Sequence, residues 1–446
     1  MALDKKNFCV VPFVQLNTRG KGNARVCCSI GGLDYGIPKD YTVDQLNPEN
    51  YNSKTKVYNL GTDKIEDMWN SKFMKDFRMK MLNNEHIPNC EFCHRMEKSG
   101  LTSKRLSKNK TFFKKTEPKL DGYKQTGGIV DMMPQWWEIR LSTKCNLSCI
   151  MCAPGLSSMM FNEFKKWEKE GRILDHMAGS LQIAKQSGVE YLSKSTYFLE
   201  QLRDNLKNVV FMEFRGGEVF ADKHSIDFID EISKTEHAKN IRLDISTNST
   251  ILDERILEIL NRFKGGKLRF SIDAYKDRDE LIRYHTKWDK VVANMYRANR
   301  LLKDSWIFWS QSTIQLANCM YMDELCWFFD DFCKQTNNNR FYLGFTSVRA
   351  KDWLRHENMP LETRYDQVEK IKKFFNKSYL CNDNVNKEWH IKSINGLISA
   401  LSSPCYENKD YNSRARGYFD KMTELRKQDY YEVYPALKYL KEYDAT

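Results

Sequence analysis

The chain has 446 residues, 41% of them hydrophobic, and carries a formal net charge of +12 at pH 7. A chain of this length is expected to form two or three domains with real hydrophobic cores. It contains no run of about 18 apolar residues, and its N-terminal MALDKKNFC lacks the apolar region of a signal peptide. Neither a membrane span nor export is therefore indicated, and we expect a cytoplasmic globular protein.

The basic balance would permit binding to a polyanion such as nucleic acid. Lysines and arginines are spread along the chain, however, and the clearest excess, at residues 104–124, has the polar composition of a solvated linker. A nucleic-acid partner is therefore not expected. Thirteen cysteines, several spaced C-x2-C or C-x3-C, indicate metal binding rather than disulfides in a chain without an export signal.

The first hundred residues are predicted to form two strands and a helix. The strands lie near 10–16 and 24–30 and are joined by a turn at 19–23, which makes them a hairpin. Apolar residues recur at helical spacing over 64–83. These elements would bring distant parts of the segment together.

Five cysteines flank these elements: Cys9, Cys27, Cys28, Cys90 and Cys93. The hairpin would place Cys9 near Cys27 or Cys28, and the helix would carry Cys90 and Cys93 to the same place. Four thiolates close a metal site, and they suit zinc as well as iron. The residues alone leave the metal open.

A strand predicted at 136–142 runs directly into three cysteines spaced C-x3-C-x2-C: Cys145, Cys149 and Cys152. Asn146 and the Ala-Pro-Gly at 153–155 favour a loop over a helix here. Three thiolates on one loop can hold three corners of a cubane iron-sulfur cluster and leave the fourth iron open to a ligand. The alternatives are a zinc site with a distant fourth ligand and three unrelated buried thiols.

Six predicted strands alternate with helical segments, which indicates a parallel α/β architecture. The strands lie near 136–142, 209–215, 241–246, 267–273, 307–315 and 341–346. The long connection at 156–208 contains helical stretches near 156–170 and 191–207. It could cover a ligand site at the ends of the strands.

Polar residues and glycines follow several of these strands, at the edge where such folds bind ligands. They are Gly216, Gly217 and Glu218; Ser246, Thr247 and Asn248; Ser271 and Asp273; and Gln315 and Asn318. Taken singly, the first group could be an ordinary strand-end turn and the second a helix cap. Their recurrence at successive strand ends favours a common ligand.

The cysteine motif after the first strand resembles the hallmark of the radical S-adenosylmethionine (radical SAM) superfamily. The resemblance implies that the open iron of a [4Fe-4S] cluster chelates S-adenosylmethionine. One electron then cleaves the cofactor to methionine and a 5′-deoxyadenosyl radical, which abstracts hydrogen from a substrate. A reducing donor such as flavodoxin or ferredoxin is implied as the partner.

The same resemblance assigns roles to the residues at the strand ends. Gly216-Gly217-Glu218 matches the motif that contacts the amino group of S-adenosylmethionine, with Val219 where proline is usual. Ser246, Thr247 and Asn248 match cofactor-contacting residues, and Ser271 and Asp273 match ribose-contacting ones. Cys319 is a buried thiol or, as in radical epimerases, a hydrogen donor to the substrate radical.

The N-terminal cysteines resemble those of the twitch domain, a shortened form of the SPASM auxiliary-cluster domain, here placed before the barrel. On that pattern Cys9, Cys27, Cys90 and Cys93 hold a second [4Fe-4S] cluster, with Cys28 a rival to Cys27. A four-cysteine zinc knuckle is the alternative.

Taken together, these patterns predict an α/β fold and a chain divided into four parts. They are a small α+β twitch-like iron-sulfur domain at 1–100, a basic linker at 101–130, a partial (β/α)6 barrel of TIM type at 131–350, and a helical extension at 351–446. The resemblance implies a radical SAM enzyme acting on a peptide or protein side chain. Alternatives are the same chemistry on a sugar or nucleotide, and a non-enzymatic zinc and nucleic-acid binding protein.

Overall fold

The computed structural model describes residues 6–19, 22–31, 36–41, 55–98, 102–185, 192–348, 351–406 and 408–445. The chain divides into two compact units. Unit 1 comprises residues 1–142, 189–215 and 227–243, and unit 2 comprises residues 143–188, 216–226 and 244–446. Strand β5 (Arg242–Thr247) and helix α10 (Lys223–Ser233) have residues in both units.

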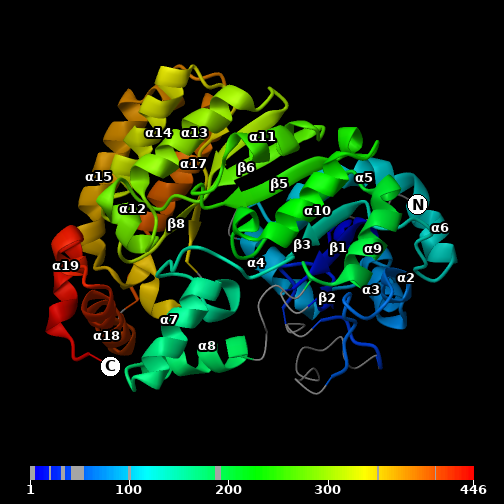
Figure 1. Cartoon of the computed structure of the whole chain (residues 1–446), viewed down its shortest axis with the longest axis horizontal. Coiled ribbons are helices and arrows are strands. Elements are labelled where there is room, and N and C mark those ends of the chain that lie inside the picture. Colours follow the sequence, from blue (N-terminus) through cyan, green and yellow to red (C-terminus); the bar gives the residue numbers. More distant parts are fainter. Residues whose placement is uncertain are drawn as a thin grey trace. The chain divides into compact units, whose positions relative to one another are not determined.

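Among its described residues, unit 1 contains the strands β2, β1, β3 and β4, which lie in this order in the sheet; Figure 1 labels the first three. Their bounds are β1 Gln15–Thr18, β2 Ala24–Arg25, β3 Trp136–Ile139 and β4 Phe211–Phe214. Strands β1 and β2 are antiparallel, as the predicted hairpin requires, whereas β1 with β3 and β3 with β4 are parallel. Residues 20 and 21 of the predicted turn lie outside the described residues.

The helices of unit 1 are α1 Val11–Val14, α2 Ile65–Trp69, α3 Lys72–Leu82, α4 Glu91–Lys98, α5 Lys104–Thr116, α6 Leu120–Gln125 and α9 Thr196–Asn205. The predicted helix at 64–83 is interrupted at Asn70, where the Ser71 side chain caps α3 by accepting from the Met74 amide. A serine in this position satisfies an amide at a helix start, so it marks a new beginning.

The strand predicted at 10–16 is wrong in its first part, because Val11–Val14 forms the one-turn helix α1. Pro12 occupies its first turn, where its fixed φ angle suits a helix and its missing N–H costs no hydrogen bond. The apolar run Val-Val-Pro-Phe-Val favoured a strand because a continuous apolar run suits a buried strand; the structure buries the run as a helical turn instead. The predicted second strand is also shorter, since β2 ends at Arg25.

Residues 104–124, expected to be a solvated linker, form helices α5 and α6 within unit 1. Phe112 stacks on Trp136 with ring centroids 5.7 Å apart, and Leu120 and Tyr123 are also buried. The Arg105 guanidinium forms an ion pair with Glu97 and donates to the Phe8 carbonyl oxygen at 3.0 Å. The many charged residues of this segment made its apolar, buried side chains hard to recognise in the sequence. The predicted domain boundaries stay predictions.

Unit 2 contains strands in the order β5-β6-β7-β9, with β6, β7 and β9 parallel, and a second parallel pair, β8 with β10. Their bounds are β6 Gly265–Phe270, β7 Trp306–Ser310, β8 Ser312–Ile314, β9 Phe341–Tyr342 and β10 Phe345–Ser347. The α/β class is therefore confirmed. The segments 307–315 and 341–346, each predicted as a single strand, are both divided between two sheets.

Unit 2 also contains a set of helices, of which those beyond residue 351 form the predicted helical C-terminal part (Figure 1). They are α7 Ser158–Lys169, α8 Asp175–Lys185, α11 Glu254–Asn261, α12 Asp277–Ile282, α13 Trp288–Leu301, α14 Met322–Thr336, α15 Leu361–Lys377, α16 Tyr379–Asn382, α17 Lys387–Leu401, α18 Lys409–Arg426 and α19 Tyr430–Val433. Helix α15 packs against both α14 and α17. Helix α8 was not predicted.

Candidate cluster and cofactor site

The three-cysteine motif lies in unit 2, on a loop that is held by backbone hydrogen bonds from outside it. The Ser148 amide donates to the Tyr284 carbonyl oxygen at 3.1 Å, and the Ile150 amide donates to that of Ile282 at 2.9 Å. At the start of α7, the Ser158 hydroxyl accepts from the Cys145 amide at 3.0 Å. The loop predicted from Asn146 and Ala-Pro-Gly is confirmed, and its backbone is fixed although it is not helical.

The three thiols lie close enough to influence one another. Burial raises the pKa of Cys145 and of Cys149 to about 12, and that of Cys152 to about 11. A negative charge on Cys152 raises the pKa of Cys145 further, and one on Cys149 raises that of Cys152. Thiols of this kind stay protonated until a metal displaces the protons and satisfies the thiolates.

The glycine pair after β4 touches the cysteine loop directly. Gly217 has a φ angle of +51°, and a Cβ added there would lie 2.2 Å from the Lys144 carbonyl oxygen. That oxygen also accepts from the Glu218 amide at 2.7 Å. Only glycine combines this φ angle with so close an approach, so a glycine at position 217 is required for the cysteine loop and the Glu218 loop to meet.

The Glu218 carboxylate joins the residues after β4 to those after β5. It accepts from the Thr247 hydroxyl at 2.9 Å, the Asn248 amide at 2.5 Å and the Phe220 amide at 3.3 Å. Burial raises the pKa of Glu218 to about 7, and these hydrogen bonds act in the opposite direction. The carboxylate is therefore positioned from three sides.

A second connection runs from Asn248 back to the cysteine loop. Its side-chain amide donates to the Asn146 Oδ1 at 2.8 Å, and Asn146 Nδ2 donates to the Thr250 hydroxyl at 2.8 Å. The structure thus brings together three groups that the sequence placed at separate strand ends. Their proximity is the main structural support for one common site.

The remaining predicted residues are engaged within the fold. The Ser246 hydroxyl donates to Gln311 Oε1 at 3.2 Å, and the Ser271 amide donates to the Thr247 carbonyl oxygen at 2.9 Å. Asp273 is buried and forms an ion pair with Arg283 at 2.7 Å. Its carboxylate also accepts from the Thr313 amide at 2.7 Å, so Asp273 has a structural role in this site.

Arg283 is a site residue that the sequence did not reveal. Besides its pairing with Asp273, its Nη1 lies 3.9 Å from Cys149 Sγ. Burial raises the pKa of Asp273, and the Arg283 guanidinium opposes this shift. An arginine in an amphipathic helical segment carries no signal of this role before the fold places it.

Gln315 and Asn318 follow β8 and differ in their surroundings. Asn318 Nδ2 donates to the carbonyl oxygens of Asp273 at 2.7 Å and Thr313 at 2.9 Å. The Gln315 side chain is fully buried, and neither of its polar atoms has a hydrogen-bond partner among the described residues. A buried amide of this kind is available to a ligand. Cys319 is buried, and burial raises its pKa to about 12.

The N-terminal cysteines form a second group, in unit 1. Cys9 and Cys93 are buried, and Cys27 and Cys90 are half-buried. Burial raises the pKa of Cys9 and of Cys27 to about 12; charges on Cys27 and Cys93 raise that of Cys9 further, and charges on Cys27, Cys9 and Cys93 do the same for Cys90. These thiols therefore lie near enough to affect one another's ionisation, and their role as the four ligands stays a prediction.

Cys28 differs from these four cysteines. It is exposed, and its sulfur accepts from the Lys104 ammonium at 3.0 Å. A charge on Cys27 is among the main causes that raise the pKa of Cys9 and of Cys90. Cys27, the more buried of the two thiols, therefore stays the predicted fourth ligand, with Cys28 as its rival.

In the described ranges, no three His, Cys, Asp or Glu side chains are grouped as a ready-made site for a metal ion. In the same ranges, no helix has the length and apolar character needed to cross a membrane. The thiols of each group nevertheless supply the soft donors that iron-sulfur clusters require.

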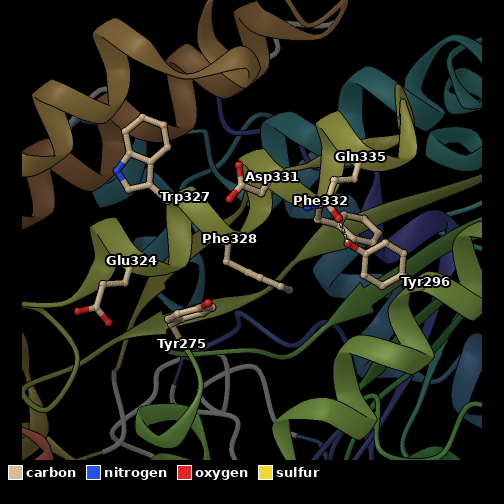
Figure 2. A pocket seen from close by; sticks show the side chains of 8 residues that line it. All are labelled: Tyr275, Tyr296, Glu324, Trp327, Phe328, Asp331, Phe332 and Gln335. Carbon is tan, nitrogen blue, oxygen red and sulfur yellow. Dashed lines mark hydrogen bonds between the residues drawn. The ribbon is translucent and has the colours of Figure 1, made fainter.

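A separate pocket of about 410 Å³ lies in unit 2 along α14 (Figure 2). It is lined by Tyr275, Tyr296, Glu324, Trp327, Phe328, Asp331, Phe332 and Gln335. Glu324 is paired with Arg278 at 2.6 Å, and the Tyr296 hydroxyl donates to Gln335 at 2.7 Å. The pocket contains none of the predicted site residues.

Comparison with known families agrees with both sites. Residues 139–310 match the radical SAM superfamily, and residues 9–95 match SPASM, an iron-sulfur cluster-binding domain. These two matches support an enzyme of the radical SAM class, with a [4Fe-4S] cluster and S-adenosylmethionine as its cofactors and an auxiliary iron-sulfur cluster in the segment that matches SPASM. The matches give no support to the alternative of a non-enzymatic zinc and nucleic-acid binding protein.

Solved structures show only weak similarity. Native anSMEcpe with bound AdoMet is 15% identical with a TM-score of 0.35, over 56% of this chain and 62% of that one. Spore photoproduct lyase with bound AdoMet and dinucleoside spore photoproduct is 11% identical with a TM-score of 0.35, over 60% and 75%. The chain thus spans about three-fifths of the first structure. No curated protein matched the chain.

Proposed function

We propose that this enzyme cleaves S-adenosylmethionine reductively and abstracts hydrogen from a peptide or protein side chain. The observation that carries the cofactor site is the direct contact of the cysteine loop, Gly217-Glu218 and Thr247-Asn248. The match to an auxiliary-cluster domain supports the substrate class, because such domains accompany peptide modification in the family that the sequence resembles.

In this proposal, Cys145, Cys149 and Cys152 hold three irons of the radical SAM cluster. When bound, the cluster and S-adenosylmethionine supply a 5′-deoxyadenosyl radical that takes a hydrogen atom from the substrate. Glu218 has one acceptor position left beyond its three hydrogen bonds, and it accepts from the cofactor amino group. Gly216 keeps that approach open.

Further residues have orienting roles. Ser246, Thr247, Asn248 and Ser271 line the cofactor side of the strand ends, and Gln315 binds cofactor or substrate through its free amide. Asp273 orients Arg283 through their ion pair. Its carboxylate also accepts a hydrogen bond from the ribose of the cofactor. In unit 1, Cys9, Cys27, Cys90 and Cys93 hold the auxiliary cluster as a [4Fe-4S] centre. Flavodoxin or ferredoxin as donor and a cytoplasmic location belong to the same proposal.

The first test is anaerobic reconstitution with iron and sulfide, followed by metal analysis and a dithionite assay for 5′-deoxyadenosine. Two [4Fe-4S] clusters would give about eight irons per chain. About four irons with one zinc would leave the enzyme intact and make unit 1 a zinc domain. Failure of the reconstituted enzyme to cleave S-adenosylmethionine would overturn the proposed activity.

The second test concerns the substrate. Extract from cells grown in heavy water is separated by size into peptides and metabolites, and each fraction is added to the reconstituted enzyme. Deuterium in the released 5′-deoxyadenosine identifies the fraction from which hydrogen was taken. Deuterium transfer from the peptide fraction supports the proposal, whereas transfer from the metabolite fraction alone favours a sugar or nucleotide.

A further inference from the structure

Three residues beyond the radical SAM match donate hydrogen bonds to backbone carbonyl oxygens of the cysteine loop, and two of them, Lys351 and Tyr418, share one acceptor. The Lys351 ammonium donates to the Ile150 carbonyl oxygen at 2.7 Å and to the Tyr418 hydroxyl at 3.1 Å. The Tyr418 hydroxyl donates to the same carbonyl oxygen at 2.7 Å. Ile150 lies between the ligands Cys149 and Cys152, so these contacts act on the part of the loop that presents both sulfurs.

Arg426, at the end of α18, holds the neighbouring loop residue. Its Nη2 donates to the Ser148 carbonyl oxygen at 2.8 Å, and the guanidinium is ion-paired with Glu163 at 2.7 Å. It also donates to the Tyr430 hydroxyl at 3.1 Å. The positive charge of Arg426 is therefore balanced within the protein.

The charge of Lys351 is not balanced in this way. The side chain is 6% exposed, and no carboxylate forms an ion pair with it among the described residues. An isolated buried ammonium is costly unless an anion lies nearby. Burial lowers the pKa of Lys351 to about 7, and charges on Cys152 and Cys149 act in the opposite direction. The thiols become anions when they bind metal.

We propose that Lys351 is a positioning residue for the radical SAM cluster, fixing Ile150 by its hydrogen bond and facing the cluster thiolates with its ammonium. The proposal rests on the assignment of the cluster to Cys145, Cys149 and Cys152. Reduction adds one negative charge to the cluster, so a nearby cation stabilises the reduced form. Lys351 therefore makes the reduction potential less negative and ties the cluster loop to the C-terminal helices.

The test compares three substitutions in the full-length reconstituted enzyme. Lys351→Gln keeps a hydrogen-bond donor but removes the charge, Lys351→Arg keeps the charge, and Lys438→Met removes an exposed lysine of the same C-terminal part. The potential of the cluster is measured by redox titration with electron paramagnetic resonance, in a background where Cys9→Ala removes the auxiliary signal. Iron content and the rate of iron loss to a chelator are measured in parallel.

We expect a more negative potential for K351Q and a value close to the parent enzyme for K351R and K438M. If K351Q folds by circular dichroism but holds no iron while K351R holds the parent amount, the charge is again required and the proposal is supported. An unchanged potential and iron content in K351Q would overturn it. An equal loss in K351Q and K351R would also overturn it, because shape and not charge would then matter.

This outcome is separable from failure of the proposed function. If the parent enzyme itself binds no cluster at Cys145, Cys149 and Cys152, the assignment of the site fails. If the parent enzyme cleaves S-adenosylmethionine but all variants have the same potential, only the role of Lys351 fails.

Discussion

At the scale of single residues, the strongest constraint lies at Gly217. Replacement by alanine would add a Cβ 2.2 Å from the Lys144 carbonyl oxygen at a φ angle of +51°. We expect G217A to lose about 2 kcal/mol of stability or more, through strain and displaced backbone, and to lose iron from the three-cysteine site. Urea unfolding and iron analysis measure both effects.

Gly179 provides the matched control. It lies within α8, and an added Cβ there would meet nothing within 4 Å. Alanine in a helix is favoured over glycine by about 0.5–1 kcal/mol, so G179A should be slightly more stable and keep its iron. Equal behaviour of the two variants would contradict the proposed contact between the two loops.

Glu218 offers a second prediction at this scale. E218Q keeps the shape and one acceptor oxygen but removes the charge that faces the cofactor amino group. A hydrogen bond to a charged group contributes about 1.5–3 kcal/mol, so the Kd for S-adenosylmethionine should rise by roughly tenfold to a hundredfold. Equilibrium binding to the reconstituted enzyme measures this change.

The iron content of E218Q should stay unchanged, because Glu218 is not a cluster ligand. E258Q, on the exposed face of α11, is the control and should bind the cofactor normally. A normal Kd in E218Q would remove Glu218 from the cofactor site.

The residue scale also shows what a sequence can reveal about a site. Cysteine spacing and Gly-Gly-Glu are local patterns with a direct chemical meaning, so Cys145, Gly217 and Glu218 could be found without a structure. Lys351 could not, since its partner Ile150 is 201 residues away along the chain. Nothing in the local sequence distinguishes such a lysine from a solvated one.

At the scale of elements, periodicity predicted the strands of the α/β core but not their exact division. Val11–Val14 became a helix because Pro12 suits a first helical turn, although its apolar neighbours resemble a strand. Helix α5 was taken as a linker because eight basic residues between 104 and 124 concealed the buried Phe112. In both cases tertiary packing overrode the local pattern.

Helix α17 carries a testable pH effect through His390. Its side chain is fully buried, and burial lowers its pKa to about 4 from the ordinary value of 6.5. Between pH 6.5 and 4 the unfolded chain binds a proton that the folded chain does not, so stability falls as the pH falls through this window. By pH 5 this group alone costs about 2 kcal/mol.

Replacing His390 by leucine should therefore reduce the loss of thermal stability between pH 7.5 and pH 5. The measurement is the Tm of each protein at the two pH values, with His224→Leu, at an exposed histidine of α10, as the control. An equal drop in Tm for H390L and the parent chain would show that His390 is not buried in the neutral form.

At the scale of the whole molecule, the enzyme has two cysteine groups in two separately compact units. Each unit supplies all the predicted ligands of its own cluster: Cys145, Cys149 and Cys152 lie in unit 2, and the N-terminal four lie in unit 1. Loss of one cluster should therefore leave the other assembled. Because the two sites are independent, the choice between Cys27 and Cys28 as the auxiliary ligand can be tested by iron analysis of single variants.

The exchange of Cys27 or Cys28 for alanine decides which thiol is the auxiliary ligand. Cys27 influences the pKa of Cys9 and of Cys90, whereas Cys28 is exposed and bound by Lys104. C27A should lose about four of about eight irons and still cleave S-adenosylmethionine with dithionite, and C28A should keep all of them. The opposite result would make Cys28 the ligand, and full iron content in both variants would show that either thiol can complete the site.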